Sequence, residues 1–273
     1  MPTLPPENVP PTPPEPHRQR LVAESFGADA ERYDRTRPRY PEALVRRIAT
    51  ASPGPDLLDV GCGTGIAARQ FLAAGCRVLG VEPDARMAVV ARQFGLPVEE
   101  AGFEGWDPAG RKFDVVVAGQ AWHWIDPVAG AAKAASVLRP GGLLAAFWNV
   151  FELPPEVLAA VDEVCARVLP DSPFRYRAEP GAALQAYDSL LARAAEGIRA
   201  AGGLGEPEQW RQDWAWTCTR DAWLDQMPTQ GAFTRLPPEQ LAEVLAAAGA
   251  AIDALGGSFP MRYTTVALIA VRG

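Results

Sequence analysis

Apolar residues follow two different periods along this chain. Between residues 56 and 150, short runs that are apolar on both faces alternate with stretches whose apolar positions lie three or four residues apart. Such runs are typical of buried parallel strands, and the stretches between them are typical of amphipathic helices. The pattern predicts strands at 56–60, 76–81, 97–101, 113–119 and 142–149, and helices at 65–75, 83–95 and 126–142.

The alternation stops after Asn149. Residues 152–205 show helical periodicity with no strand between the helices, so we expect a helical cap inserted at 151–208. The two-residue period of Trp214, Trp216 and Cys218 predicts a strand at 210–219, and a closing strand follows at 262–272. The predicted fold class is α/β, with a Rossmann-like, doubly wound, seven-stranded sheet that is mostly parallel with an antiparallel last strand.

This organisation predicts four segments. Eight prolines and little apolar bulk make residues 1–16 a flexible tail, because such a segment buries too little surface to offset its ordering entropy. An N-terminal lid segment and the core follow at 17–150. The helical cap comes next at 151–208, and residues 209–273 complete the core sheet.

Composition narrows the partners that we expect. The net charge is −7, which disfavours nucleic acid because phosphate binding requires clustered positive charge. We interpret the basic residues between His17 and Arg39 as a solvated face. Four scattered cysteines and two histidines show no zinc-binding spacing, so we expect no metal site. The sequence shows no leader peptide and no membrane span, and we expect a cytoplasmic monomer or homodimer.

The stretch DLLDVGCGTGIAARQ carries the strongest functional signal. A predicted strand runs into three alternating glycines, Gly61, Gly63 and Gly65, and then into a helix. Glycine permits positive φ and brings the backbone close to a ligand, and the helix N-terminus favours an anionic group. Glu82 ends the next predicted strand, where a carboxylate can accept hydrogen bonds from both ribose hydroxyls. Together, the glycine turn and Glu82 predict a nucleoside ligand.

Two classes of ligand compete for this turn. The dinucleotide fingerprint is GxGxxG, whereas here the pattern is GxGxG and Ile66 stands in place of the third glycine. Asp59 precedes the turn by two residues. A carboxylate at that position can face an ammonium group, which S-adenosylmethionine has and NAD lacks.

The quoted motifs resemble those of a known enzyme family. LLDVGCGTG, then VEPD, FDVVVAGQAWHW and VLRPGGLLAAFWN, are similar to class I S-adenosylmethionine-dependent methyltransferases over about residues 57–150. The opening FGADAERYDRTRPRYP and the later HW resemble the small-molecule subgroup that includes trans-aconitate-type (methyltransferase type 11) enzymes.

The resemblance implies a role for individual residues. The turn and Asp59 would hold the methionine part of S-adenosylmethionine, Glu82 the ribose, and neighbouring residues the adenine. After methyl transfer the product would be S-adenosylhomocysteine. The implied cofactor-binding residues are Tyr33, Asp59, Gly61, Cys62, Gly63, Thr64, Gly65, Glu82, Pro83, Phe103, Glu104, Gln120 and Ala121.

Methyl transfer from a sulfonium mainly requires alignment of the reacting atoms and exclusion of water. A carboxylate acceptor needs no base, whereas a hydroxyl or a protonated amine does, and His123 beyond the fourth strand is our candidate catalytic base. The alternative is that His123 is structural. The subgroup resemblance also implies that Arg37 meets a substrate carboxylate. The candidate substrate-binding residues are Arg37, Tyr40, Trp122, Trp124 and Trp148.

Three functions are therefore weighed. We expect a methyltransferase that acts on a small molecule by in-line displacement, with transfer to oxygen, nitrogen or carbon left open. An NAD(P)-dependent oxidoreductase is the first alternative, and the missing third glycine counts against it. The second is a protein that binds S-adenosylmethionine without methylating, as a regulator or a cyclase-like catalyst.

Overall fold

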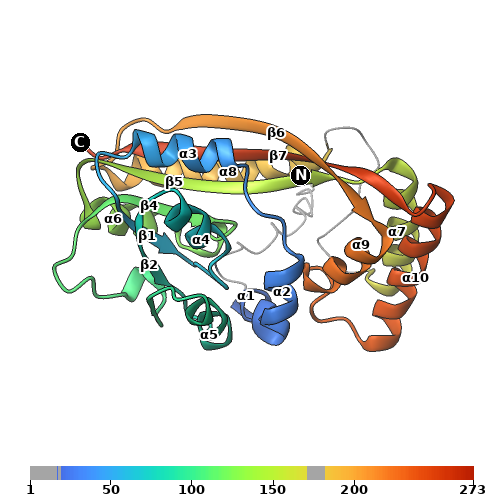
Figure 1. Cartoon of the computed structure of the whole chain (residues 1–273). Helices are drawn as coiled ribbons and strands as arrows, with labels where there is room; N and C mark the ends of the chain where they lie inside the picture. Colours follow the sequence, from blue (N-terminus) through green and yellow to red (C-terminus); the bar gives the residue numbers. More distant parts are fainter. Residues whose placement is uncertain (1–16, 18–19, 171–181) are drawn as a thin grey trace, which may run out of the picture.

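The central sheet has the strand order β3-β2-β1-β4-β5-β7-β6 in the computed structural model, which describes residue 17, residues 20–170 and residues 182–273 (Figure 1). The pairs from β3 through β5 are parallel, and β7 runs antiparallel to both β5 and β6. The predicted mostly parallel sheet with an antiparallel last strand is confirmed. The strands are β1 (Asp56–Val60), β2 (Arg77–Val81), β3 (Val98–Glu99), β4 (Phe113–Gly119), β5 (Leu138–Glu152), β6 (Glu208–Thr219) and β7 (Ser258–Val271).

Helices cover both faces of the sheet. One hydrophobic cluster joins the sheet to α6 (Pro127–Val137) and α8 (Ala182–Ala201), and a second joins the opposite face to α3 (Glu42–Ala51) and α4 (Ile66–Ala73). β1 and β4 are buried along almost their whole length, which explains why apolar residues occupy both faces of each strand. The predicted tail at 1–16 lies outside the described residues.

Strands β5, β6 and β7 continue beyond the core into a second group of helices, on the right of Figure 1. There a separate hydrophobic cluster joins the far ends of β6 and β7 to α7 (Pro155–Val168), α9 (Arg220–Gln226) and α10 (Pro238–Ala254). The two helices of the predicted cap thus pack in different places, because α7 contacts α10 while α8 lies against α6.

The N-terminal segment lies between the core and this second group of helices (Figure 1). Phe26 and Tyr33 of this segment pack against α5 of the core. The remaining helical elements are α1 (Arg20–Ser25), η2 (Phe26–Asp29), α2 (Ala30–Thr36), α5 (Ala85–Gln93), η3 (Phe103–Gly105), η4 (Trp122–Trp124) and η5 (Met227–Thr229).

One predicted boundary is wrong. We expected the helix at 126–142 to be stopped by Pro140 and Gly141, but it ends at Val137 and β5 begins at Leu138. Leu138 is fully buried and pairs with Phe113, and the Gly141 N–H donates to the Arg272 carbonyl at 2.9 Å. The long-range pairing with the chain end therefore takes residues that the local pattern assigns to a helix.

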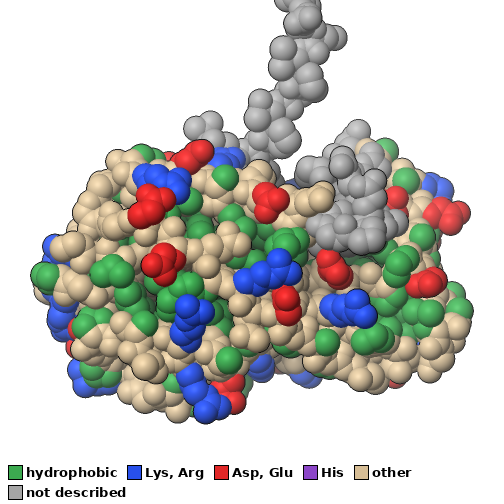
Figure 2. Space-filling model, turned by 90° about the horizontal axis from the view of Figure 1, so that it is seen from above, with side chains coloured by type: hydrophobic (Ala, Val, Ile, Leu, Met, Phe, Trp, Pro, Cys, Tyr) green, Lys and Arg blue, Asp and Glu red, His purple; other side chains and the backbone are tan. Residues whose placement is uncertain are grey.

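None of the helices in the described part of the chain is long and apolar enough to span a bilayer. No group of three or more His, Cys, Asp or Glu residues is placed to hold a metal ion among the described residues. On the face seen in Figure 2, basic and acidic side chains are interspersed rather than gathered by sign.

Candidate active site

The glycine turn joins β1 to α4 at the carboxyl edge of the sheet. Gly61, Gly63 and Gly65 have φ of +63°, +56° and +84°, in the left-handed region where a Cβ is strained. A Cβ on Gly61 would also meet the Cβ of Ala121 at 2.6 Å. The turn therefore requires glycine for two reasons, its conformation and the close approach of the loop after β4.

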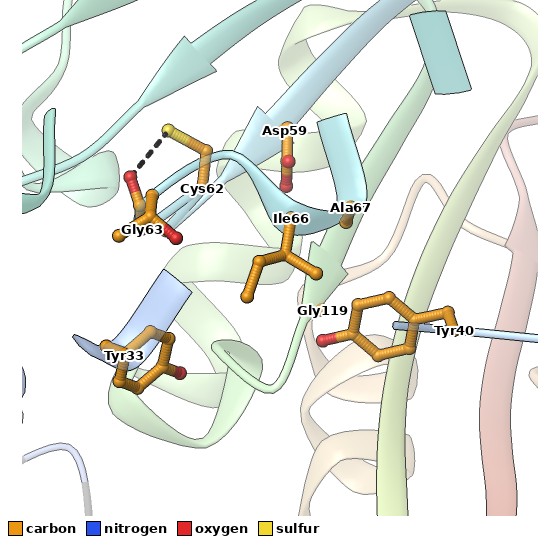
Figure 3. A pocket seen from close by; sticks show the side chains of 10 residues that line it. Tyr33, Tyr40, Asp59, Cys62, Gly63, Ile66, Ala67 and Gly119 are labelled. Atoms are coloured by element: carbon orange, nitrogen blue, oxygen red, sulfur yellow. Dashed lines mark hydrogen bonds between the residues drawn. The ribbon is translucent and has the colours of Figure 1, made fainter. Parts of the chain in front are cut away.

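A small cleft opens beside this turn, with about 320 Å³ of empty space that includes open solvent at its mouth. Figure 3 shows that its side chains come from separate parts of the chain, with Tyr33 and Tyr40 contributed by the N-terminal segment and Asp59 by β1. The Tyr40 ring packs on Phe147 with 4.6 Å between ring centroids, which fixes its hydroxyl close to Gly119. The cleft is lined by Tyr33, Tyr40, Asp59, Gly61, Cys62, Gly63, Thr64, Ile66, Ala67 and Gly119.

Asp59 is a buried carboxyl group in the cleft lining whose hydrogen bonds are incomplete. Its side chain is 1 % exposed, and its Oδ2 is buried without a hydrogen-bond partner. Burial, and secondly the nearby Glu82 carboxylate, raise the pKa of Asp59 to about 8. A buried carboxylate oxygen without a partner is costly, so this position favours a cationic ligand group that supplies the missing donors.

Glu82 follows β2 and reaches back to the glycine turn. Its Oε2 accepts the Gly63 N–H at 2.8 Å, and its Oε1 accepts the Asp84 N–H at 2.9 Å. Burial raises the pKa of Glu82 to about 7, and these two backbone donors partly oppose that rise. A carboxylate has about four acceptor sites, so two remain for ligand hydroxyls. Next to it, the predicted adenine contact Pro83 is exposed.

Asp34 of α2 ties the N-terminal segment to the turn, a contact that sequence reasoning missed. Its Oδ1 accepts the Thr64 hydroxyl at 2.8 Å and forms an ion pair with Arg69 of α4. Asp34 is 7 % exposed. An acid inside a run of arginines was the available signal, because a buried carboxylate needs such partners.

The arginines of the N-terminal segment also make specific contacts, so the interpretation as a simple solvated face is incomplete. Arg32 and Arg35 both pair with Asp225 of α9, at 2.8 and 3.0 Å. Arg37 donates to the Thr229 carbonyl in η5, and its guanidinium lies 4.8 Å from the centre of the Tyr33 ring. These contacts join α2 to the second group of helices.

Arg37 retains unused hydrogen-bonding capacity. Its Nε is buried without an acceptor, and no carboxylate forms an ion pair with Arg37 among the described residues. Burial raises the pKa values of Tyr40, Tyr187 and Tyr263, and the positive charge of Arg37 partly offsets that rise. Arg37 is thus a cation in a phenol-rich region next to the cleft.

His123 lies in η4, directly beyond β4. Its Nδ1 is 3.1 Å from the indole Nε1 of Trp148, and its ring is 4.6 Å from that of Trp124. Burial lowers the pKa of His123 to about 4, so the ring is neutral at pH 7. Trp122 and Trp148 are buried in the core and do not line the cleft, so their substrate-binding roles stay predictions.

Gln120 occupies a strained position at the end of β4. It has φ of +55°, unusual for a residue with a side chain, and its Nε2 donates to the Asn149 carbonyl at 3.0 Å. Its Oε1 is buried without a partner. Strain of this kind is concentrated at functional sites, but Gln120 does not line the cleft, and its cofactor role stays a prediction.

The other predicted adenine contacts lie apart from the cleft lining. Phe103 is 3 % exposed and packs on Trp106 with ring centroids 6.5 Å apart, so its side chain belongs to the core. Glu104 accepts the Asp126 N–H at 3.1 Å, at the start of α6. Their cofactor roles stay predictions.

Comparison with known proteins agrees with this geometry. A family model described as "Methyltransferase domain" matches residues 33–255. An uncharacterised methyltransferase of Mycobacterium tuberculosis is 36% identical over 139 residues, which is 48% of this chain and 54% of that protein. A malonyl-[acyl-carrier protein] O-methyltransferase of Enterobacter lignolyticus is 32% identical over 133 residues, covering 46% of this chain and 53% of that protein.

The chain spans about half the length of the curated relatives that it matches. Among solved structures, a protein described only as a candidate type II methyltransferase from Anaeromyxobacter dehalogenans is 29% identical. That comparison covers 86% of this chain and 97% of the other, with a TM-score of 0.56. The similarity therefore includes the region beyond the core.

Proposed function

The chain belongs to the methyltransferase domain family, and from that premise we propose that it transfers a methyl group to a small-molecule acceptor. S-adenosylmethionine, the methyl donor of this family, supplies a methyl on a positively charged sulfur. The observation that carries the proposal is the buried Oδ2 of Asp59, which has no partner and lies beside an open glycine turn.

The residues present fit this cofactor. The ammonium group of S-adenosylmethionine would give Asp59 the donors that it lacks. Glu82 is held beside the turn by Gly63 and Asp84, with acceptor sites left for the ribose hydroxyls. Tyr33 and Tyr40 of the N-terminal segment line the same cleft as Asp59.

On the acceptor side, Arg37 favours an organic anion. Its guanidinium has a buried Nε without an acceptor and no ion pair with a described carboxylate, and it shares the Tyr33 ring with the cofactor cleft. A carboxylate would satisfy Nε through a charge-assisted hydrogen bond. An anionic oxygen takes a methyl group as the carbon–sulfur bond breaks and sulfur keeps the electron pair, so no proton must move.

The alternatives differ in what they bind and produce. The family match sets aside the NAD(P)-dependent oxidoreductase, whereas a protein that binds S-adenosylmethionine without methylating would use the same cleft.

The four cysteines are all buried, free thiols, which favours a reducing cytoplasm as the location that we propose. Monomer and homodimer both stay open.

Calorimetric titration with S-adenosylhomocysteine and with NAD tests the cofactor assignment, and we expect only the first to bind. Turnover is then measured as S-adenosylhomocysteine formed with a panel of small carboxylic acids and their amides. Binding without product across the panel would favour the non-methylating alternative. Equal turnover of acids and amides would refute the role of Arg37.

Variants at two nearby arginines, one at the end of α2 and one just beyond it, separate the two sites. Arg37→Met should retain affinity for S-adenosylhomocysteine and lose turnover of the acids, since it removes only the acceptor contact. Arg35→Gln is the matched control, because Arg35 lies in the last turn of α2, two residues before Arg37, but is exposed and paired with Asp225. It should retain both properties.

A further inference from the structure

The tautomer of His123 follows from its neighbour on β5. The Trp148 Nε1 lies 3.1 Å from the His123 Nδ1, within hydrogen-bond distance. An indole N–H can only donate, so Nδ1 must be the unprotonated, accepting nitrogen. In a neutral imidazole the proton then sits on Nε2.

We infer that Trp148 is a positioning residue that holds His123 as a hydrogen-bond donor, and that His123 does not act as a general base. The substrate-facing part of this inference rests on the proposed methyltransferase function. A base needs a free lone pair, and the one lone pair of this tautomer already accepts the indole N–H. The role that we predicted from sequence is thereby reversed: Nε2–H gives a hydrogen bond instead of taking a proton.

The surroundings of the pair keep this arrangement in place. Trp148 is fully buried between the sheet and the helices α6 and α8, so its indole cannot turn away without disrupting the core. Burial also keeps the imidazole neutral, since it lowers the pKa of His123 to about 4. In the described part of the chain no acceptor is hydrogen-bonded to Nε2, which leaves this donor for a ligand.

This assignment restricts the acceptor. A hydroxyl or a protonated amine must lose a proton during methylation, and His123 in this tautomer does not take it. A carboxylate arrives already ionised and can accept the Nε2–H hydrogen bond. The inference therefore agrees with the unpaired cation of Arg37, although the two rest on different observations.

Nitrogen NMR of the histidine side chains tests the tautomer without any substrate. The chain has two histidines, so a His17→Gln variant assigns the spectrum. We expect an unprotonated Nδ1 and a protonated Nε2 at pH 7, and a displaced Nδ1 resonance in Trp148→Phe. A protonated Nδ1 in the unsubstituted protein would overturn the inference.

Trp122→Phe is the matched control for the loss of an indole from the core. Trp122 belongs to the same hydrophobic cluster and is 1 % exposed, but its Nε1 has no hydrogen-bond partner. The control should leave the His123 resonances in place. If both variants displace Nδ1 equally, repacking explains the effect and the hydrogen bond does not.

Kinetics of His123 variants separate a donor from a base. Glutamine places an amide N–H near the position of Nε2, so His123→Gln should retain kcat within about tenfold, whereas His123→Ala loses the donor. An amide cannot act as a base, and loss of a base costs about 10²–10⁴-fold. A His123→Gln protein that binds S-adenosylhomocysteine normally but is as inactive as His123→Ala contradicts the inference. Absence of S-adenosylhomocysteine binding in the unsubstituted protein contradicts the proposed function instead.

Discussion

Replacement of Asp59 by asparagine should make the ligand-free protein more stable and its cofactor binding weaker. The carboxylate is buried and one of its oxygens has no partner, so folding without ligand must desolvate a charge or hold a proton. Asparagine keeps the shape and removes the charge. The two opposite effects arise from one atom, which makes the variant a direct test of the cofactor assignment.

The magnitude follows from the pKa of Asp59, which rises from 3.8 to about 8 on folding. Between about pH 4 and pH 8 the folded protein retains a proton that the unfolded chain has released, so its unfolding free energy falls as the pH rises. Each pH unit in this window costs about 1.4 kcal/mol. Asparagine does not ionise, so the unfolding free energy of Asp59→Asn does not fall in this way. The variant therefore exceeds the unsubstituted protein in unfolding free energy by an amount that grows from nothing near pH 4 to a ceiling on the order of 5 kcal/mol above pH 8.

Urea unfolding of both proteins at pH 5 and pH 8.5, without ligand, measures this difference. Asp114→Asn is the control, because that carboxylate is also buried but pairs with Arg139 at 2.8 Å and accepts the Asp56 N–H at 2.9 Å. Removal of a partnered carboxylate should destabilise the protein. A stabilising effect confined to Asp59→Asn identifies the missing partner as its cause.

Calorimetry with S-adenosylhomocysteine at pH 8.5 completes the test. Loss of a buried charge pair costs about 2–5 kcal/mol, which corresponds to a weakening of about 30-fold to several thousand-fold. The assignment of Asp59 to the cofactor is wrong if Asp59→Asn binds this ligand as tightly as the unsubstituted protein. The reasoning about the buried charge is refuted if the variant is the less stable of the two at pH 8.5.

Two further substitutions test how the cleft is built. Gly61→Ala should cost about 2–4 kcal/mol of unfolding free energy, because it adds a contact with Ala121 to the strain of positive φ. Gly75 has φ of +91° and open space around it, so Gly75→Ala measures the cost of the strain alone in the same urea assay. If the two variants lose equal amounts of unfolding free energy, the contact with Ala121 contributes nothing. Asp34→Asn should cost about 3 kcal/mol and loosen the N-terminal segment, as measured by urea unfolding and limited proteolysis. Asp225→Asn breaks partly exposed pairs, which should cost about 1 kcal/mol, and a larger loss there than at Asp34 would contradict this account.

Local pattern was sufficient to predict the core elements and the turn. The strand at 56–60 was predicted with the bounds that β1 has, because apolar residues on both faces are typical of a buried parallel strand. The glycine turn and Glu82 were found from spacing, since positive φ and the end of a parallel strand are local properties. The boundary between α6 and β5 was missed because Leu138 is held by its pairing with a distant strand.

The partners of the polar groups were decided only by the tertiary structure. Arg37 and the Thr229 carbonyl are 192 positions apart, and Asp34 meets Arg69 only because the tertiary structure brings this residue of α2 to the start of α4. Trp148 stands in a continuous apolar run that shows that it is buried, but not that its N–H faces His123. Sequence periodicity determines which side of an element is buried, whereas a hydrogen bond also depends on what another element brings to that side.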